Sequence, residues 1–153
     1  MIEPQTEFLW SVEDWNRNLF MRWAGLRVIQ AKDGFAEIEL TVDDHHRGGG
    51  RTSAVNGAIQ AYTHDVIQGV AISSLFDPAI QRMATMHLNI EYPKLLLADH
   101  VITATAKVLR LGSNVAFCDS EFLDAKGNIC SRCTGTYLVK RSRPHPSLGL
   151  APV

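Results

Sequence analysis

The sequence predicts an α+β protein in which one antiparallel sheet of about five or six strands wraps around a single long helix. Apolar residues surround most of segment 55–76, six other segments have strand-like composition, and turn signals separate them. A helix that is apolar on nearly all sides must be enclosed. Because one sheet cannot cover every side of that helix, we expect a second copy of the chain to complete the burial, with C2 symmetry as the commonest arrangement.

The length and composition fit one cytoplasmic domain. The chain has 153 residues, of which 46% are hydrophobic and 20% are charged. Its formal net charge of −1 offers no basic surface to a nucleic-acid backbone, so we expect no nucleic-acid partner. The first residues lack the pattern of a signal peptide, and no run of about 18 apolar residues predicts a membrane span.

The N-terminal part is expected to hold a helix and a hairpin. Ser11 is the predicted N-cap of a helix over Ser11–Ala24. The hairpin strands Leu26–Ala31 and Phe35–Val42 are joined by an Asp-Gly turn. We expect residues 1–25 to pack on a domain formed by residues 26–141. Residues 142–153 are expected to form a C-terminal tail that is disordered or packed on a partner subunit.

The long helix is predicted over Val55–Phe76, with Thr52 or Ser53 as its cap. The glycines that precede it lack the ending of a phosphate-binding loop. The adjacent His45 and His46 have poor geometry for two ligands of one metal, so we expect a solvated loop and no metal site. Four further strands are predicted over Met83–Tyr92, Val101–Leu111, Asn114–Asp124 and Ile129–Lys140.

Asp65 is the residue of the long helix that most needs an explanation, because burying an ionised carboxylate costs several kcal/mol or raises its pKa. Asn56-Gly57-Ala58 lies at the expected helix start, where backbone N–H groups have no helical partner. Such an N–H can bind a developing oxyanion, and Asp65 can act as nucleophile or base. The structural alternative is a plain helix entry, with Asp65 bonded to a polar group of a partner chain.

Other reactive side chains are expected to be structural. Cys130 and Cys133 lie three positions apart in a predicted strand and so point to opposite faces, which disfavours a shared metal or a redox pair. We expect buried cysteines. His64 points about 100° away from the neighbouring carboxylate. It shares a stripe with Gln60 and Gln68, which we expect to face the subunit interface or solvent.

The sequence resembles the PaaI-type acyl-CoA thioesterases of the hotdog fold. Their motif is His-Gly-Gly at the start of the central helix, followed by an acidic residue seven positions after the last glycine. Asn56-Gly57-Ala58 occupies the first part of this motif and Asp65 the second. Segment 85–92 resembles the family strand that ends in Asn-Ile-x-Tyr, and segment 111–117 resembles a turn that meets CoA. The resemblance covers about residues 26 to 139.

This resemblance implies hydrolysis of an acyl-CoA thioester to a free acid and CoA, without a metal or redox cofactor, in a homodimer or a dimer of dimers. It makes Asp65 the nucleophile or general base and Gly57 the donor of the oxyanion-binding N–H. Thr85 would orient the hydrolytic water from across the dimer interface, and Asn56 takes the place of the motif histidine. The residues expected to contact the substrate or CoA are Ala58, Gly69, Lys94, Arg110, Gly112, Ser113 and Asn114.

Four positions depart from the family pattern. Asn56 cannot change its charge near neutral pH, and Ala58 narrows the approach to the helix start. Gly50 falls where relatives often have a polar side chain, and Ser113 where a basic residue commonly meets phosphate. These departures leave open a non-catalytic acyl-CoA-binding or regulatory protein. A hotdog hydratase or dehydratase is less favoured, because that chemistry generally pairs a histidine with the acid.

Overall fold

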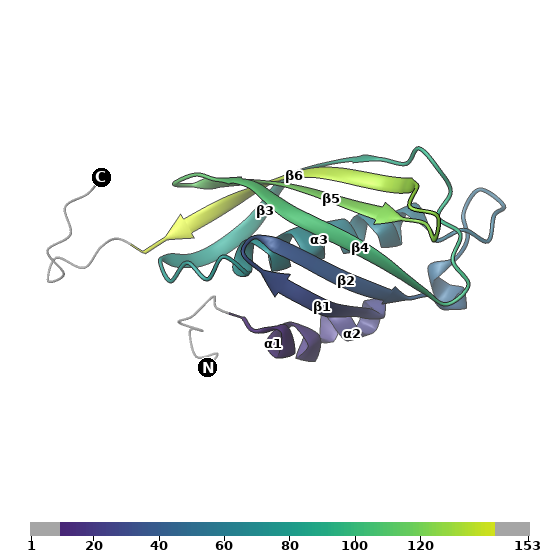
Figure 1. The fold of residues 1–153 in the computed structure, drawn as a ribbon, viewed down its shortest axis with the longest axis horizontal. Coiled ribbons are helices and arrows are strands. Elements are labelled where there is room, and N and C mark those ends of the chain that lie inside the picture. Colours follow the sequence, from purple (N-terminus) through teal and green to yellow (C-terminus); the bar gives the residue numbers. More distant parts are fainter. Residues whose placement is uncertain (1–9, 143–153) are drawn as a thin grey trace, which may run out of the picture.

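The structure is a computed structural model that describes residues 10–142, so the expected tail over residues 142–153 lies outside it except for Ser142. Two short helices and two strands precede a central helix, and four strands follow it (Figure 1). The elements are α1 (Val12–Arg17), α2 (Leu19–Ala24), β1 (Leu26–Lys32), β2 (Phe35–Thr41), the 3-10 helix η1 (Asp44–His46), α3 (Gly57–Ser73), β3 (Ile80–Glu91), β4 (Val101–Leu111), β5 (Val115–Leu123) and β6 (Ile129–Arg141). None of the helices in the described part of the chain is long and apolar enough to cross a membrane.

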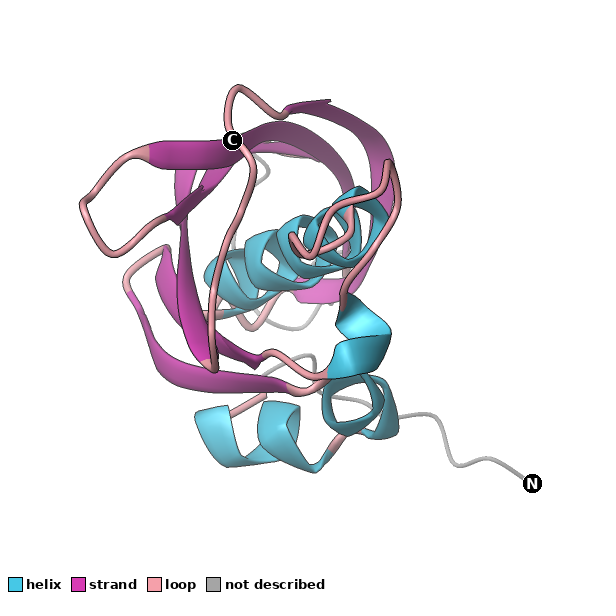
Figure 2. Ribbon diagram, turned by 90° about the vertical axis from the view of Figure 1, so that its right-hand side faces the viewer, coloured by secondary structure: helices cyan, strands magenta, loops and turns pink. Residues whose placement is uncertain are grey.

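All six strands form one sheet in the order β1-β2-β4-β5-β6-β3, and every neighbouring pair is antiparallel. The sheet curls around α3, with the two short helices at its β1 side (Figure 2). This arrangement confirms the predicted α+β class and the sheet wrapped around one helix. It leaves one side of α3, between β3 and the N-terminal helices, without a strand over it.

The core lies between α3 and the inner face of the sheet. Alternate residues of β2 and β4 are buried, as the period of two requires. They contribute to a cluster with the buried side of α3 that contains Ala36, Ile38, Leu40, Ile67, Val70, Ala71, Ile102, Ala104 and Ala106. Apolar contacts with the sheet therefore fix the orientation of α3 about its own axis, and the open face of the helix lies on the opposite side.

The N-terminal helical segment is two helices rather than the single helix predicted over Ser11–Ala24. Asn18 adopts an extended conformation, with φ −62° and ψ 138°, and separates α1 from α2. The predicted cap is confirmed, since the Ser11 hydroxyl accepts a hydrogen bond from Asp14 N–H. Trp15 ties α1 to α3, because its indole Nε1–H donates to Ser73 Oγ at 3.0 Å.

The central helix begins two residues later and ends three residues earlier than predicted. Asn56 caps it, with its Oδ1 accepting from Ala58 N–H at 2.8 Å. The prediction that Thr52 or Ser53 would be the cap is wrong. Thr52 Oγ1 instead accepts from Ala54 N–H within the preceding loop. An Asn side chain at the N-cap satisfies a backbone donor that would otherwise lack a partner.

Candidate active site

Asp65 lies on the open side of α3 and is partly exposed. Thr85 Oγ1 donates to Asp65 Oδ1 at 2.6 Å, and the Tyr137 hydroxyl lies 3.1 Å from the same oxygen. Within residues 10–142, no group hydrogen-bonds to Asp65 Oδ2. Thr85 was expected to act across the dimer interface, whereas the structure places it on the carboxylate of its own chain.

A β-bulge brings Thr85 to this position. Thr85 pairs with Tyr137, while Leu88 pairs with Gly135, so three steps along β3 match two along β6. Strict alternation from Leu88 would have turned Thr85 to the outer face of the sheet. The extra residue, next to Thr85, restores the inward direction, a common use of bulges near functional sites.

A cavity of about 300 Å³ opens beside the carboxylate. Its aromatic walls have their polar tips occupied, because Trp15 donates to Ser73 and the Tyr62 hydroxyl donates to the Phe20 carbonyl at 2.9 Å. The cavity is therefore apolar away from its carboxylate end, a character suited to an acyl group. Its lining residues are Trp15, Phe20, Tyr62, Asp65, Val66, Gly69, Met83, Thr85 and Tyr137.

Gly69, one of the residues expected at the substrate, lies against this cavity. A Cβ built on Gly69 would lie 3.2 Å from Met83 Cε, closer than side chains normally approach. A larger residue at this position would push Met83 aside or fill part of the space. The glycine thus preserves the cavity volume.

The start of α3 offers a second polar group. Within the described part of the chain, Gly57 N–H has no hydrogen-bond acceptor, as expected for the first position of a helix. Asn56 caps the helix through Oδ1, and its Nδ2 donates to Gly48 O at 3.1 Å. The Tyr92 hydroxyl donates to Gly57 O at 2.8 Å and braces the turn. Ala58 is exposed at the surface of this turn.

Gly57 and Asp65 do not meet within one chain. They are eight positions apart on one helix, which corresponds to about 12 Å along its axis. A reacting carbonyl cannot touch both groups at that separation. The two halves of the candidate site can act on one carbonyl only if a second copy brings its own helix start to this carboxylate.

Two groups of residues that were expected to contact the substrate or CoA lie far apart within one chain. Lys94 lies near Cys130, where it pairs with Asp124 at 2.7 Å, and this hydrogen bond raises the pKa of the lysine. The turn that follows β4 lies near the other end of β6, because Asn114 O accepts from Val139 N–H. Nine strand residues, or about 30 Å, separate these regions, so Lys94 and this turn do not form one group within a single chain.

Arg141 gives the β4–β5 turn a positive charge that the sequence reasoning missed. Its Nε donates to Ser113 O at 3.1 Å, and its guanidinium also pairs with Asp77. Gly112 O is a weaker acceptor for the same group, at 3.4 Å. Arg110 is exposed on the adjacent strand. A guanidinium from β6 thus reaches the turn where Ser113 stands in place of a basic residue, although its charge is already paired with Asp77.

His64 is sealed between α3 and the sheet. Its Nδ1 lies 2.7 Å from Ser120 Oγ and its Nε2 lies 2.9 Å from Ser131 Oγ, and the side chain is fully buried. Burial lowers the pKa of His64 to about 4. Gln60 and Gln68 are buried on the same side, so the expectation that this stripe faces solvent or a subunit interface is wrong.

The cysteines are buried, as expected. Cys130 and Cys133 are both free thiols with almost no exposure. Burial raises the pKa of Cys133 to about 11, which keeps this thiol protonated near neutral pH. A register shift in β6 leaves Cys130 without a partner on β5. The period of two is interrupted there, so it does not predict that the two cysteine side chains point to opposite faces of the sheet.

The loop histidines lie closer to an acidic group than their sequence suggested. Asp43, His45 and His46 each place one possible ligand atom within 4.8 Å of the others. His46 Nδ1, however, accepts from Asp43 N–H at 2.9 Å and closes the 3-10 turn. Burial, followed by the nearby His45, lowers the pKa of His46. His46 is buried, so the expectation of a solvated loop is wrong for this residue, and a role in the local fold accounts for its position.

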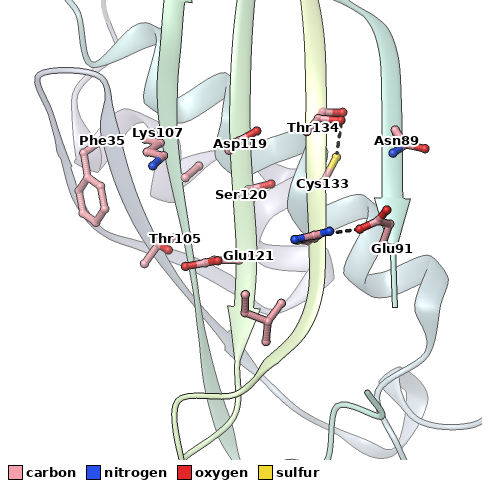
Figure 3. Close-up of a pocket in the computed structure, with 13 residues that line it drawn as sticks. Phe35, Asn89, Glu91, Thr105, Lys107, Asp119, Ser120, Glu121, Cys133 and Thr134 are labelled. Atoms are coloured by element: carbon pink, nitrogen blue, oxygen red, sulfur yellow. Dashed lines mark hydrogen bonds and ion pairs between the residues drawn. The ribbon is translucent and has the colours of Figure 1, made fainter. Parts of the chain in front are cut away.

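A larger cavity, of about 450 Å³, lies on the outer face of the sheet (Figure 3). Polar side chains of neighbouring strands line it, including Lys107, Asp119 and Glu121. The Arg132 guanidinium pairs with Glu91 at 2.6 Å across its rim. Its size exceeds that of the cavity beside Asp65, yet it holds no carboxylate aligned by hydroxyl donors. The chemistry therefore favours the smaller cavity.

Comparisons with known proteins agree with this architecture, although no family model matches the sequence. The chain is 25% identical over 122 residues to a "putative esterase" of Thermoplasma acidophilum, covering 80% of this chain and 89% of that relative. It is 26% identical over 124 residues to a "putative esterase" of Saccharolobus solfataricus, with 80% and 84% covered.

Three solved structures share the fold. The conserved protein PA5202 of Pseudomonas aeruginosa has a TM-score of 0.74 at 23% identity, covering 84% of this chain and 99% of that one. A hypothetical thioesterase of Streptococcus pneumoniae, solved with coenzyme A, has a TM-score of 0.72 at 18% identity, covering 87% of this chain and 99% of that one. The PaaI protein of Escherichia coli has a TM-score of 0.68 at 19% identity, covering 78% of this chain and 86% of that one. The hotdog fold is confirmed.

Proposed function

We propose that this hotdog-fold protein hydrolyses an acyl-CoA thioester to a free acid and CoA. The observation that carries the proposal is the state of Asp65, whose Oδ1 is held by two hydroxyl groups while Oδ2 has no partner within the described residues. The apolar cavity beside it suits an acyl chain. The names of the two esterase relatives and the coenzyme A bound to one structural neighbour support hydrolysis of a CoA ester.

The site is complete only in a homodimer. β3 is an edge strand with exposed residues along most of its length, and it lies next to the open face of α3. An uncovered edge of this length is a natural place for another copy to pair. A two-fold axis here would run the two central helices in opposite directions and bring Gly57 of the partner subunit to Asp65. A dimer of dimers would then use another surface.

The proposed reaction follows from these positions. The acyl group occupies the aromatic-lined cavity, and the thioester carbonyl oxygen accepts from Gly57 N–H of the partner subunit. Asp65 either removes a proton from a water that attacks the carbonyl carbon or attacks that carbon itself. In the first route, collapse of the tetrahedral intermediate breaks the carbon–sulfur bond, and the proton passes to the CoA thiolate. In the second route, the same bond breaks to leave a mixed anhydride on Asp65, and water hydrolyses this anhydride to the free acid and the carboxylate while the CoA thiolate takes up a proton. Neither route needs a metal or a redox cofactor.

The surroundings of Asp65 favour hydrolysis over hydration. A hydratase needs a histidine beside its acid, whereas His64 is turned into the sheet and bonded to two serines. One observation supports the alternative of a non-catalytic acyl-CoA-binding protein: Asn56 stands in place of the motif histidine, cannot change its charge, and uses its Oδ1 as the helix cap.

Replacing Asp65 with Asn tests the proposal. Release of free thiol from a panel of short, medium and aromatic acyl-CoAs should fall at least about a hundredfold in kcat, because Asn cannot act as base or carboxylate nucleophile. Asp99→Asn, which changes an exposed aspartate far along the chain, serves as the matched control. Wild-type turnover in the Asp65→Asn variant would contradict the mechanism. Tight CoA binding without thiol release from the wild-type protein would favour the binding module.

A further inference from the structure

Tyr137 is the part of the Asp65 site that neither the motif nor its spacing predicts. It lies on β6, is 1% exposed, and places its hydroxyl 3.1 Å from Asp65 Oδ1 and 3.1 Å from the Asp65 backbone oxygen. It is the register partner of Thr85, whose hydroxyl bonds to the same Oδ1. Two hydroxyl groups from neighbouring strands thus converge on one oxygen of the carboxylate.

The Tyr137 hydroxyl stays protonated near neutral pH and so remains a hydrogen-bond donor. Burial, followed by the negative charge of Asp65, raises the pKa of Tyr137. A neutral phenol donates a hydrogen bond to a carboxylate, and such charge-assisted hydrogen bonds are the stronger kind; here the hydroxyl shares its one hydrogen between Asp65 Oδ1 and the Asp65 backbone oxygen. The contact therefore restricts rotation of the Asp65 carboxylate.

The ring of Tyr137 is held by packing that involves the same helix. Gly135 precedes it on the inner face of β6, and a Cβ there would lie 1.7 Å from Gln68 Oε1 and 2.9 Å from Tyr137 Cε2. Gln68 is fixed in turn, because its Nε2 donates to Ser120 Oγ and to the Cys133 carbonyl. Asp65 lies one turn of α3 before Gln68. Its carboxylate therefore faces a tyrosine that is next to the fixed Gln68 side chain and to Gly135.

We propose that Tyr137 is a positioning residue for Asp65, which shares Oδ1 with Thr85 and thereby makes Oδ2 the oxygen that reacts. The inference rests on the proposed hydrolysis and adds a residue and an atom assignment to it. Tyr137 acts through the carboxylate and contributes no group to the substrate carbonyl. Its loss should consequently change the rate of the chemical step more than the binding of substrate.

The test is Tyr137→Phe in the full-length protein, which removes the hydroxyl and keeps the buried ring. We expect kcat for a good acyl-CoA substrate to fall about tenfold, the usual effect of losing one hydrogen bond to a charged group, with KM within about twofold. Tyr62→Phe is the matched comparison, because its ring lines the same cavity while its hydroxyl binds the Phe20 carbonyl. Any effect of Tyr62→Phe should appear in KM.

A second measurement separates positioning from a general structural role. In an Asp65→Asn background there is no carboxylate to align, so adding Tyr137→Phe should leave the residual rate unchanged. A further fall in that background, or wild-type kcat in the single Tyr137→Phe variant, would overturn the inference while leaving hydrolysis by the wild-type protein intact. Failure of the wild-type protein to release thiol from any acyl-CoA would instead refute the proposed function itself.

Discussion

Two neighbouring residues of α3 show how one helix carries a sealed polar side and an open one. His64 is fully buried, and both of its ring nitrogens meet serine hydroxyls of the sheet. Asp65 is partly exposed, and only one of its carboxylate oxygens has partners within residues 10–142. About 100° of helical rotation separates a side chain committed to the fold from one that retains a free atom.

The difference lies in which atoms are satisfied. A buried polar group must have partners, and when all of them are internal the group contributes to stability and specificity of packing. A group with an unpaired atom beside an apolar cavity can still bind or react. On this criterion Asp65 and Gly57 N–H belong to the candidate site, whereas His64 belongs to the core.

The largest effect on the open side is expected from removing the Gly57 N–H. Gly57 is the first residue of α3, a position where proline is tolerated, and Asn56 already has the extended conformation that proline requires of the preceding residue. Gly57→Pro should therefore fold and lower kcat about 10²–10³-fold, the usual cost of losing one oxyanion donor. Thiol release at saturating acyl-CoA measures this.

Gly57→Ala is the control for shape. Its Cβ would lie 3.4 Å from the Tyr92 ring, an ordinary contact, and the N–H is retained. Its loss should be about tenfold at most, since only the approach is narrowed. Equal losses in the alanine and proline variants would show that the N–H itself is not used.

On the buried side of α3, we expect His64 to affect the free energy of unfolding rather than kcat, and by a smaller amount. In the folded protein burial lowers the pKa of His64 to about 4, whereas an unfolded histidine binds a proton near pH 6.5. The unfolded state therefore gains a proton first, and stability is full above about pH 6.5 and decreases as the pH falls toward 4. We expect a loss of about 2–3 kcal/mol over this range in urea denaturation.

His64→Gln should weaken this dependence on pH and lower the stability at pH 7, because a glutamine cannot titrate and fits the two serines less well. His87→Gln, on the exposed part of β3, is the matched control and should retain the wild-type slope. A wild-type slope in His64→Gln would contradict the assignment of His64 to a neutral, buried network.

Much of the fold was predictable from the sequence, because its elements follow simple periods. The alternation in β2 and the Asp-Gly turn before it predicted the hairpin, and the all-round apolar character of segment 55–76 predicted an enclosed helix. The break at Asn18 was not predictable, since the aromatic spacing of segment 15–23 continues across it. Propensity and periodicity do not locate a single residue that leaves the helical conformation.

The candidate site was only partly predictable. Asp65 and Gly57 could be identified from their positions on the helix, because an unexplained carboxylate and a helix start are local features. Tyr137 could not, since its role depends on the pairing of β3 with β6 and on a bulge beside Thr85. The direction of His64 was missed for the same reason, because the sheet residues that face it come from far along the chain.

The most direct test of the account is complementation between two inactive variants. Asp65→Asn and Gly57→Pro subunits, unfolded together and refolded as a mixture, should form about one half mixed dimers, each with one site that has both groups intact. The mixture should regain about one quarter of the wild-type thiol-release activity, since half of the sites in half of the dimers are restored. Activity that stays at the level of the separate variants would contradict a site shared between two subunits.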